Sequence, residues 1–157
     1  AYVEDEALAI NGFSPLEIRD PDAQSESELV ANFLAWATEI RGWNFVGQNP
    51  SFDLAFVQAA CQRSHQAFPF PHRALDTHTM AFMHLTTRGK EPPFNVVHHG
   101  SGMNLDFVLK YVGIPAEPKP HNALTGALCH AEAASRLLYN KKLLPDFGMY
   151  PIPFDDV

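Results

Sequence analysis

The chain has 157 residues, of which 46% are hydrophobic and 18% charged, a balance typical of one soluble globular domain with its own core. The formal net charge of −7 at pH 7 argues against a general polyanion binder, because non-specific affinity for nucleic acid comes from many Lys and Arg contacts to phosphate. The chain shows no long apolar run and no signal peptide at AYVEDEALAI, so we expect no membrane contact and a cytoplasmic location. Cys61 and Cys129 predict free thiols.

The first part of the chain predicts a loop, a helix and a short strand. Residues 1–22 contain the breaker pairs NG, SP and DP, which are typical of turns. Ser25 and Glu28 form a capping box, which predicts a helix that ends near Gly42. The short apolar segment 43–47 predicts a buried strand. The expected inner face of the helix consists of Leu29, Phe33, Trp36, Ala37 and Ile40.

The next helix carries a carboxylate, Asp53, inside an apolar run. Asn49 and Pro50 predict its start, because Asn caps a helix and Pro fits the first helical position. Asp53 then lies in the first turn, where the positive end of the helix dipole favours a negative charge. Phe52 and Phe56 share one face of this helix.

The second half of the chain predicts one short strand and three helices. The strand covers 73–76, and the helices cover 77–85, 105–112 and 122–139. The tail, 140–157, is rich in proline and is expected to be extended over the surface. On the longest helix the expected buried stripe consists of Leu124, Ala127, Leu128, Ala131, Ala134 and Leu138.

Read in order, these segments resemble the DnaQ-like exonucleases of the DEDDh type, which remove nucleotides from 3′ ends. The second exonuclease motif corresponds to 47–56, GQNPSFDLAF, and the third to 121–127, HNALTGA. Between them, LDT at 75–77 resembles the Asp-Thr strand end of the family. The resemblance implies an α/β fold of the ribonuclease H-like type, a mixed sheet flanked by helices.

The chain departs from the family pattern in two places. The first motif, Asp-x-Glu on a central strand, is missing upstream of Ile10, so we interpret 1–157 as the C-terminal two-thirds of a single exonuclease domain that lacks its N-terminal strands. Gly126 occupies the position of the last metal-binding Asp. Glu132, the nearest acid on the same helix, is rotated away from that face. We therefore expect little nuclease activity from this segment alone.

The resemblance assigns a role to five residues. It implies that Asp53 binds a metal ion and that His121 is the general base. It also implies contacts to the substrate from Asn49, Phe52 and Phe56. The complete domain would hold two Mg²⁺ or Mn²⁺ ions. Its substrates would be single-stranded or frayed 3′ ends of DNA or RNA, and a polymerase or another protein is a possible partner.

Several alternatives stay open at this stage. The chain as a whole could be a catalytically silent exonuclease-fold module that binds nucleic acid or a partner protein. Asn49 could be only a helix cap, Phe52 and Phe56 could be core residues, and Asp76 is interpreted as a helix cap. A shared zinc site at the adjacent pair His98-His99 is not expected, because neighbours on a strand point to opposite faces. Basic residues that could contact phosphate or simply face water are Arg63, His65, His72, Arg73, Arg88 and Lys90.

Overall fold

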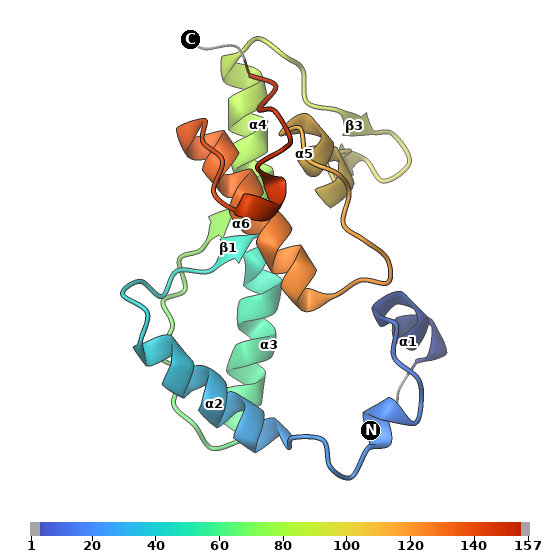
Figure 1. Ribbon diagram of the computed structural model, residues 1–157, viewed down its shortest axis with the longest axis vertical. Coiled ribbons are helices and arrows are strands. Elements are labelled where there is room, and N and C mark those ends of the chain that lie inside the picture. Colours follow the sequence, from blue (N-terminus) through green and yellow to red (C-terminus); the bar gives the residue numbers. More distant parts are fainter. Residues whose placement is uncertain (1–3, 155–157) are drawn as a thin grey trace. The chain divides into compact units, whose positions relative to one another are not determined.

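The chain folds into two compact units, each with its own hydrophobic cluster. The computed structural model describes residues 4–154. The first unit comprises Ala1–Phe45 and Pro50–Ala74, and the second comprises Val46–Asn49 and Leu75–Val157. Figure 1 shows the helices and strands in sequence colours. None of the helices within 4–154 has the length and apolar character needed to cross a membrane.

The first unit contains more helix than the sequence suggested. Its elements are α1 (Asp5–Asn11), a 3₁₀ turn η1 (Glu17–Arg19), α2 (Glu26–Thr38) and α3 (Pro50–Arg63). The predicted loop is wrong at α1, because the breaker Gly12 adopts φ +70° and closes that helix, its N–H donating to the Leu8 carbonyl. The first three residues of the predicted loop lie outside the described residues. The capping box of Ser25 and Glu28 is confirmed.

An aromatic cluster between α2 and α3 forms the core of the first unit. Phe70 is buried and its ring lies 5.2–5.9 Å from four other aromatic rings. Trp43 and Phe45 are two of these, so they turn into the cluster and leave only Val46–Gly47 as strand β1 of the predicted strand 43–47. The expected inner face of α2 is partly wrong, since Val30 and Ala37 are buried whereas Leu29 and Trp36 are exposed.

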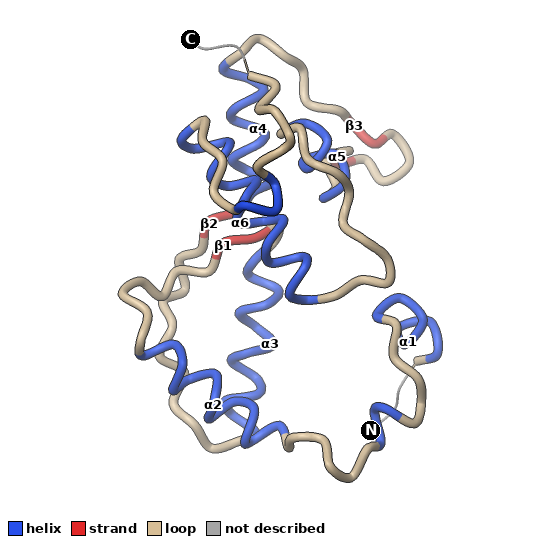
Figure 2. Tube along the Cα trace, viewed as in Figure 1, coloured by secondary structure: helices blue, strands red, loops and turns tan. Residues whose placement is uncertain are grey.

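The second unit contains two small sheets. Strand β1 pairs in parallel with β2 (Leu75–Asp76), with Val46 opposite Leu75. Strand β3 (Phe94–Asn95) pairs antiparallel with β4 (Gly100–Ser101), a hairpin that the sequence did not predict. Figure 2 shows β1 and β2 side by side. Each sheet has two strands, so the larger mixed sheet that the resemblance implies stays a proposal.

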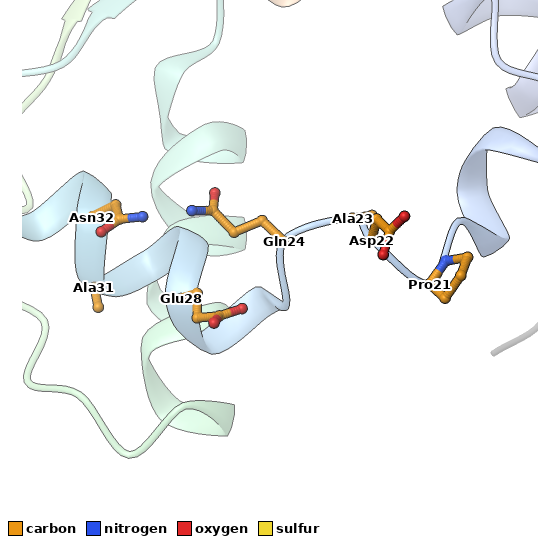
Figure 3. A pocket seen from close by; sticks show the side chains of 7 residues that line it. All are labelled: Pro21, Asp22, Ala23, Gln24, Glu28, Ala31 and Asn32. Carbon is orange, nitrogen blue, oxygen red and sulfur yellow. The ribbon is translucent and has the colours of Figure 1, made fainter.

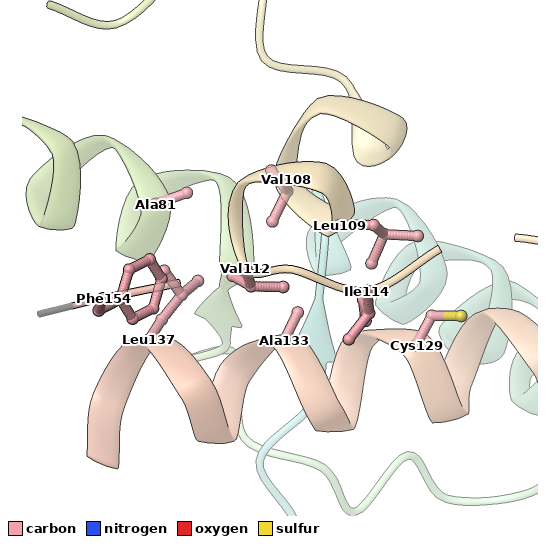
Figure 4. Close-up of a cluster of buried hydrophobic side chains, with 9 residues drawn as sticks. All are labelled: Ala81, Val108, Leu109, Val112, Ile114, Cys129, Ala133, Leu137 and Phe154. Atoms are coloured by element: carbon pink, nitrogen blue, oxygen red, sulfur yellow. The ribbon is translucent and has the colours of Figure 1, made fainter. Parts of the chain in front are cut away.

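Three helices supply the core of the second unit, and all three predicted helices are confirmed. They are α4 (Thr77–Thr87), α5 (Leu105–Tyr111) and α6 (Ala123–Tyr139). Each begins at a side-chain cap, from Asp76, Asn104 and Asn122 respectively, which satisfies backbone N–H groups that have no partner within the helix. Figure 4 shows the side chains that meet between these helices: Ala81, Val108, Leu109, Val112, Ile114, Cys129, Ala133, Leu137 and Phe154.

The buried stripe of α6 differs from the predicted one. Leu124 is 68% exposed and Leu138 is also exposed, whereas Gly126, Cys129, Ala133 and Leu137 face inward. The stripe therefore keeps the expected spacing of three and four residues but is formed by smaller side chains, which let the neighbouring helices approach closely. Both cysteines are buried free thiols, as predicted.

A buried ion pair on α6 holds the tail. The prediction of an extended surface tail is confirmed in part, because most of 140–154 is exposed and irregular. Arg136 and Glu132 are fully buried, and Arg136 Nε donates to Glu132 Oε1 at 2.7 Å. Glu132 Oε2 accepts the backbone N–H groups of Leu143 and Leu144, both at 2.9 Å. The tail then forms a 3₁₀ turn, η2 (Pro145–Phe147), and its last described residue, Phe154, enters the core. The tail residues 155–157 lie outside the described residues. The carbonyls that accept from the Arg136 guanidinium are those of Val112, Phe147, Tyr150 and Pro151.

Candidate functional site

The most ordered polar arrangement near a predicted site residue lies between α5 and α6. The connection ends at Asn122, which caps α6, and it places the carboxylate of Glu117 against the first turn of that helix. The Glu117 side chain is only 4% exposed. It accepts hydrogen bonds from His121 Nδ1 at 2.8 Å, Thr125 Oγ1 at 3.1 Å and the Asn122 N–H at 3.4 Å.

These three bonds fix the charge of Glu117 and the proton position on His121. Burial would raise the pKa of Glu117, but the hydrogen bonds from His121, Thr125 and Asn122 outweigh it and hold that pKa below its ordinary value. An ionised carboxylate can only accept, so His121 must donate through Nδ1–H. The neutral ring then has an unprotonated Nε2. The His121 side chain is 40% exposed, and within 4–154 Nε2 has no hydrogen-bond partner.

Gly126 lies directly beside this pair. An ideal Cβ at Gly126 would be 3.2 Å from Glu117 Oε1 and 3.5 Å from His121 Cε1. The Glu117 carboxylate therefore lies against the place where any side chain at position 126 would begin. The sequence motifs do not point to Glu117. The nearest acid to Gly126 on α6 is Glu132, whose carboxylate accepts a hydrogen bond from Arg136. The signal that could have identified Glu117 is a carboxylate four residues before the predicted base, combined with the missing one at Gly126.

Asp53 belongs to the first unit and is exposed in the first turn of α3. Within the described part of the chain, no hydrogen bond or ion pair engages its carboxylate. Arg63, at the other end of α3, pairs with Glu26, its Nε donating to Glu26 Oε2 at 2.9 Å. Asp53 is therefore turned to water, where it can favour the start of α3 electrostatically or bind a cation.

Phe52 and Phe56 also lie in the first unit, and their interpretation as core residues is wrong. They are 60% and 62% exposed, and their ring centroids are 4.7 Å apart. Phe56 also lines an apolar groove of about 340 Å³ between α2 and α3, whose other lining residues are Glu26, Leu29, Val30, Phe33, Val57, Ala60 and Arg63. An exposed aromatic pair of this kind offers faces on which a base can stack.

Asn49 lies at the end of β1, in the second unit. It adopts φ +55°, and its backbone N–H donates to Asp76 Oδ1 at 3.1 Å. The same Asp76 oxygen accepts the His78 N–H at 3.0 Å, which confirms Asp76 as the cap of α4. Asp76 therefore ties the carboxyl ends of the two parallel strands together. The pair His98-His99 is exposed in a turn between β3 and β4.

A polar hollow in the first unit contains none of the predicted site residues. It lies where the chain enters α2 (Figure 3), and its lining residues are Pro21, Asp22, Ala23, Gln24, Glu28, Ala31 and Asn32. Both acids that line the hollow, Asp22 and Glu28, are exposed. Glu28 is already engaged in the capping box with Ser25. The turn before α2 and the capping box at its first residues therefore account for this hollow.

The two site-forming sets belong to different units. Asp53, Phe52 and Phe56 belong to the first, and His121, Glu117 and Asn49 to the second. The structure brings His121 and Glu117 together, and it brings the two phenylalanines together. No group of three or more His, Cys, Asp or Glu side chains within 4–154 could hold a metal ion. These residues alone therefore do not fit a two-metal site, because Asp53 is the single carboxylate that the resemblance assigns to one.

Comparison with protein-family models, with curated proteins and with solved structures finds no match for this chain. The family resemblance therefore depends on the motif residues and their order alone.

Proposed function

We propose that the chain belongs to a DnaQ-like 3′–5′ exonuclease of the DEDDh type, a hydrolase that acts on the 3′ ends of DNA or RNA. The observation that carries the proposal is the His121–Glu117 pair, in which Nδ1 is bound to a buried carboxylate and Nε2 stays free on a partly exposed ring. Phosphodiester hydrolysis needs a base that takes a proton from water, and a histidine oriented in this way is suited to that role.

Exposed side chains support the other proposed roles. Asp53 is an accessible, unpaired carboxylate in the described structure and is proposed as a ligand of Mg²⁺ or Mn²⁺, together with carboxylates that the first motif would supply. When bound, such ions activate water and stabilise the leaving oxygen. Phe52 and Phe56 are proposed to stack on the terminal bases, and Asn49 to contact the substrate. A ribonuclease H-like fold, a cytoplasmic location and a polymerase or other protein partner belong to the same proposal.

Digestion of end-labelled strands tests this proposal. The natural protein that carries this chain is mixed with single-stranded DNA or RNA and Mn²⁺, and release of mononucleotides from the 3′ end is measured. We expect Asp53→Ala and His121→Ala to abolish release. The matched controls are Asp106→Ala, another exposed first-turn acid, and His98→Ala, an exposed loop histidine, both of which should leave release unchanged. Equal release by the protein and by both site variants would reject the proposal.

A catalytically silent exonuclease-fold module is the second candidate. It is favoured by Gly126, which stands where the resemblance implies a metal-binding Asp, and by the lack of a three-residue metal cluster within 4–154. This candidate predicts binding of single strands without release of mononucleotides. Binding should then weaken in Phe52→Ala and Phe56→Ala but not in Asp53→Ala, whereas the exonuclease proposal predicts loss of activity in Asp53→Ala.

A further inference from the structure

The Glu117 carboxylate is fully engaged, although neither the family motif nor the sequence pattern gives it a role. Oε2 accepts from His121 Nδ1, and Oε1 accepts from Thr125 Oγ1 and the Asn122 N–H. Removing a carboxylate from water is expensive unless its oxygens are hydrogen-bonded. Both Glu117 oxygens meet that requirement, which also makes them poor ligands for a metal ion, since binding one would break bonds already made.

Gly126 is an unfavourable residue for the interior of α6, and the residues around it explain why a glycine fits there. A glycine inside a helix is less favourable than alanine. At this position a Cβ would come within 3.2 Å of Glu117 Oε1, so an alanine would require the carboxylate to move by a few tenths of an ångström. The glycine therefore provides the space in which Glu117 can lie beside His121.

We propose that Glu117 positions the ring of His121, and that the missing side chain at Gly126 leaves the space in which the Glu117 carboxylate lies. This inference rests on the proposed exonuclease function for its catalytic consequence. Glu117 accepts a hydrogen bond from His121 Nδ1–H. This bond keeps Nε2 of the neutral ring unprotonated and fixes the orientation of the ring. Thr125 and the Asn122 N–H in turn hold Glu117. In this account the missing side chain at Gly126 and the carboxylate of Glu117 act together, because the first leaves the space that the second occupies.

The nitrogen resonances of His121 give a readout that does not depend on activity. In protein labelled with ¹⁵N-histidine, at a pH where the ring is neutral, we expect the Nδ1–H tautomer. Glu117→Ala removes the acceptor and should give a tautomer mixture dominated by Nε2–H, as in free imidazole side chains. Glu117→Gln, which keeps the volume, should give an intermediate mixture because its amide both donates and accepts. Thr125→Val is the matched control, since it removes a bond to Glu117 but leaves the His121 bond, and should keep the tautomer.

Kinetics test the catalytic consequence. Among folded variants, Glu117→Ala should lower kcat by about 10²-fold, at the lower end of the contribution of general acid–base catalysis, with little change in KM. Gly126→Asp should also lower kcat, because a second carboxylate would be placed against Glu117 and repel it from His121. A Gly126→Asp variant with higher activity than the natural protein would overturn the inference, because it would show that this position lacks a metal ligand.

The outcomes separate this inference from the proposed function. An unchanged His121 tautomer in folded Glu117→Ala would overturn the positioning role, even if the protein is an active exonuclease. A changed tautomer with unchanged kcat would overturn it as well. If the natural protein releases no nucleotides, the proposed function fails, and the tautomer measurement still decides whether Glu117 orients His121.

Discussion

The two units hold the same kind of ion pair in opposite surroundings. In the first unit Glu26 and Arg63 pair on the surface, where both side chains are about half exposed. In the second unit Glu132 and Arg136 pair with no exposure, and backbone groups satisfy the remaining donors and acceptors. Water screens the first pair but not the second. The buried pair of the second unit is therefore structural, whereas the exposed carboxylate of Asp53 in the first unit stays available to a ligand.

The largest expected effect is the loss of Arg136. Arg136→Met would leave Glu132 as an unpaired buried charge and would remove the donors to the tail carbonyls. We expect a loss of about 3–5 kcal/mol in the free energy of unfolding. Urea unfolding followed by circular dichroism measures it. Arg63→Met is the matched control and should change the midpoint little, and similar losses in both variants would contradict the difference between the units.

The next largest loss of unfolding free energy is expected from a substitution in the core of the first unit. Phe70→Ala removes the ring at the centre of the aromatic cluster and should cost about 3 kcal/mol. Both tryptophans, Trp36 and Trp43, lie in the first unit, so their fluorescence reports its unfolding in urea. Phe52→Ala, at an exposed ring, should change stability by less than about 0.5 kcal/mol. A large loss from Phe52→Ala would indicate that this ring is part of a core.

A smaller effect is expected at the start of α2. Ser25→Ala removes the side chain that accepts the Glu28 N–H and breaks the capping box. The expected loss is about 1 kcal/mol, again from the fluorescence-detected urea midpoint. Ser27→Ala, at an exposed position two residues further on in α2, serves as the comparison. An unchanged midpoint in Ser25→Ala would mean that packing alone holds this end of α2.

The smallest effect is a change in the pH dependence of stability. The folded pKa of Glu117 is below the unfolded value of about 4.3, so the unfolded chain binds more protons in acid. Its stabilisation is complete above the unfolded pKa and is lost as the pH falls through the folded pKa. Glu117→Gln should therefore flatten the fall in unfolding free energy below about pH 4.3. A matched exposed change, Glu91→Gln, should leave the curve unaltered.

The sequence predicted the helices of this chain best where a side chain marks the end. Ser25, Asp76 and Asn122 cap the helices that follow them, and Gly113, with φ +78°, follows the end of α5. These are local interactions between residues a few positions apart, so local sequence is sufficient to identify them. Helix α1 was missed because the same kind of marker, Gly12, was interpreted as a turn.

The sequence could not predict the features that depend on distant partners. The buried face of α6 is set by the tail, which converts the polar residues Glu132 and Arg136 into core residues. Hydrophobic periodicity counts such residues as surface. Likewise, Glu117 acquires its role only when the chain folds back over the first turn of α6, beside Gly126. The sequence also singles out Asp53, but no group of three or more possible metal ligands lies within residues 4–154.

The proposed role of Asp53 as a ligand of Mn²⁺ has a direct test in paramagnetic broadening. Mn²⁺ is titrated into the ¹⁵N-labelled natural protein that carries this chain, and the amide resonances around Asp53 in α3 are compared with those around Asp106, the exposed first-turn acid of α5. We predict selective broadening at the start of α3, which Asp53→Asn abolishes and Asp106→Asn leaves unchanged. Equal broadening at both helices, or broadening at α3 that persists in Asp53→Asn, would contradict this role.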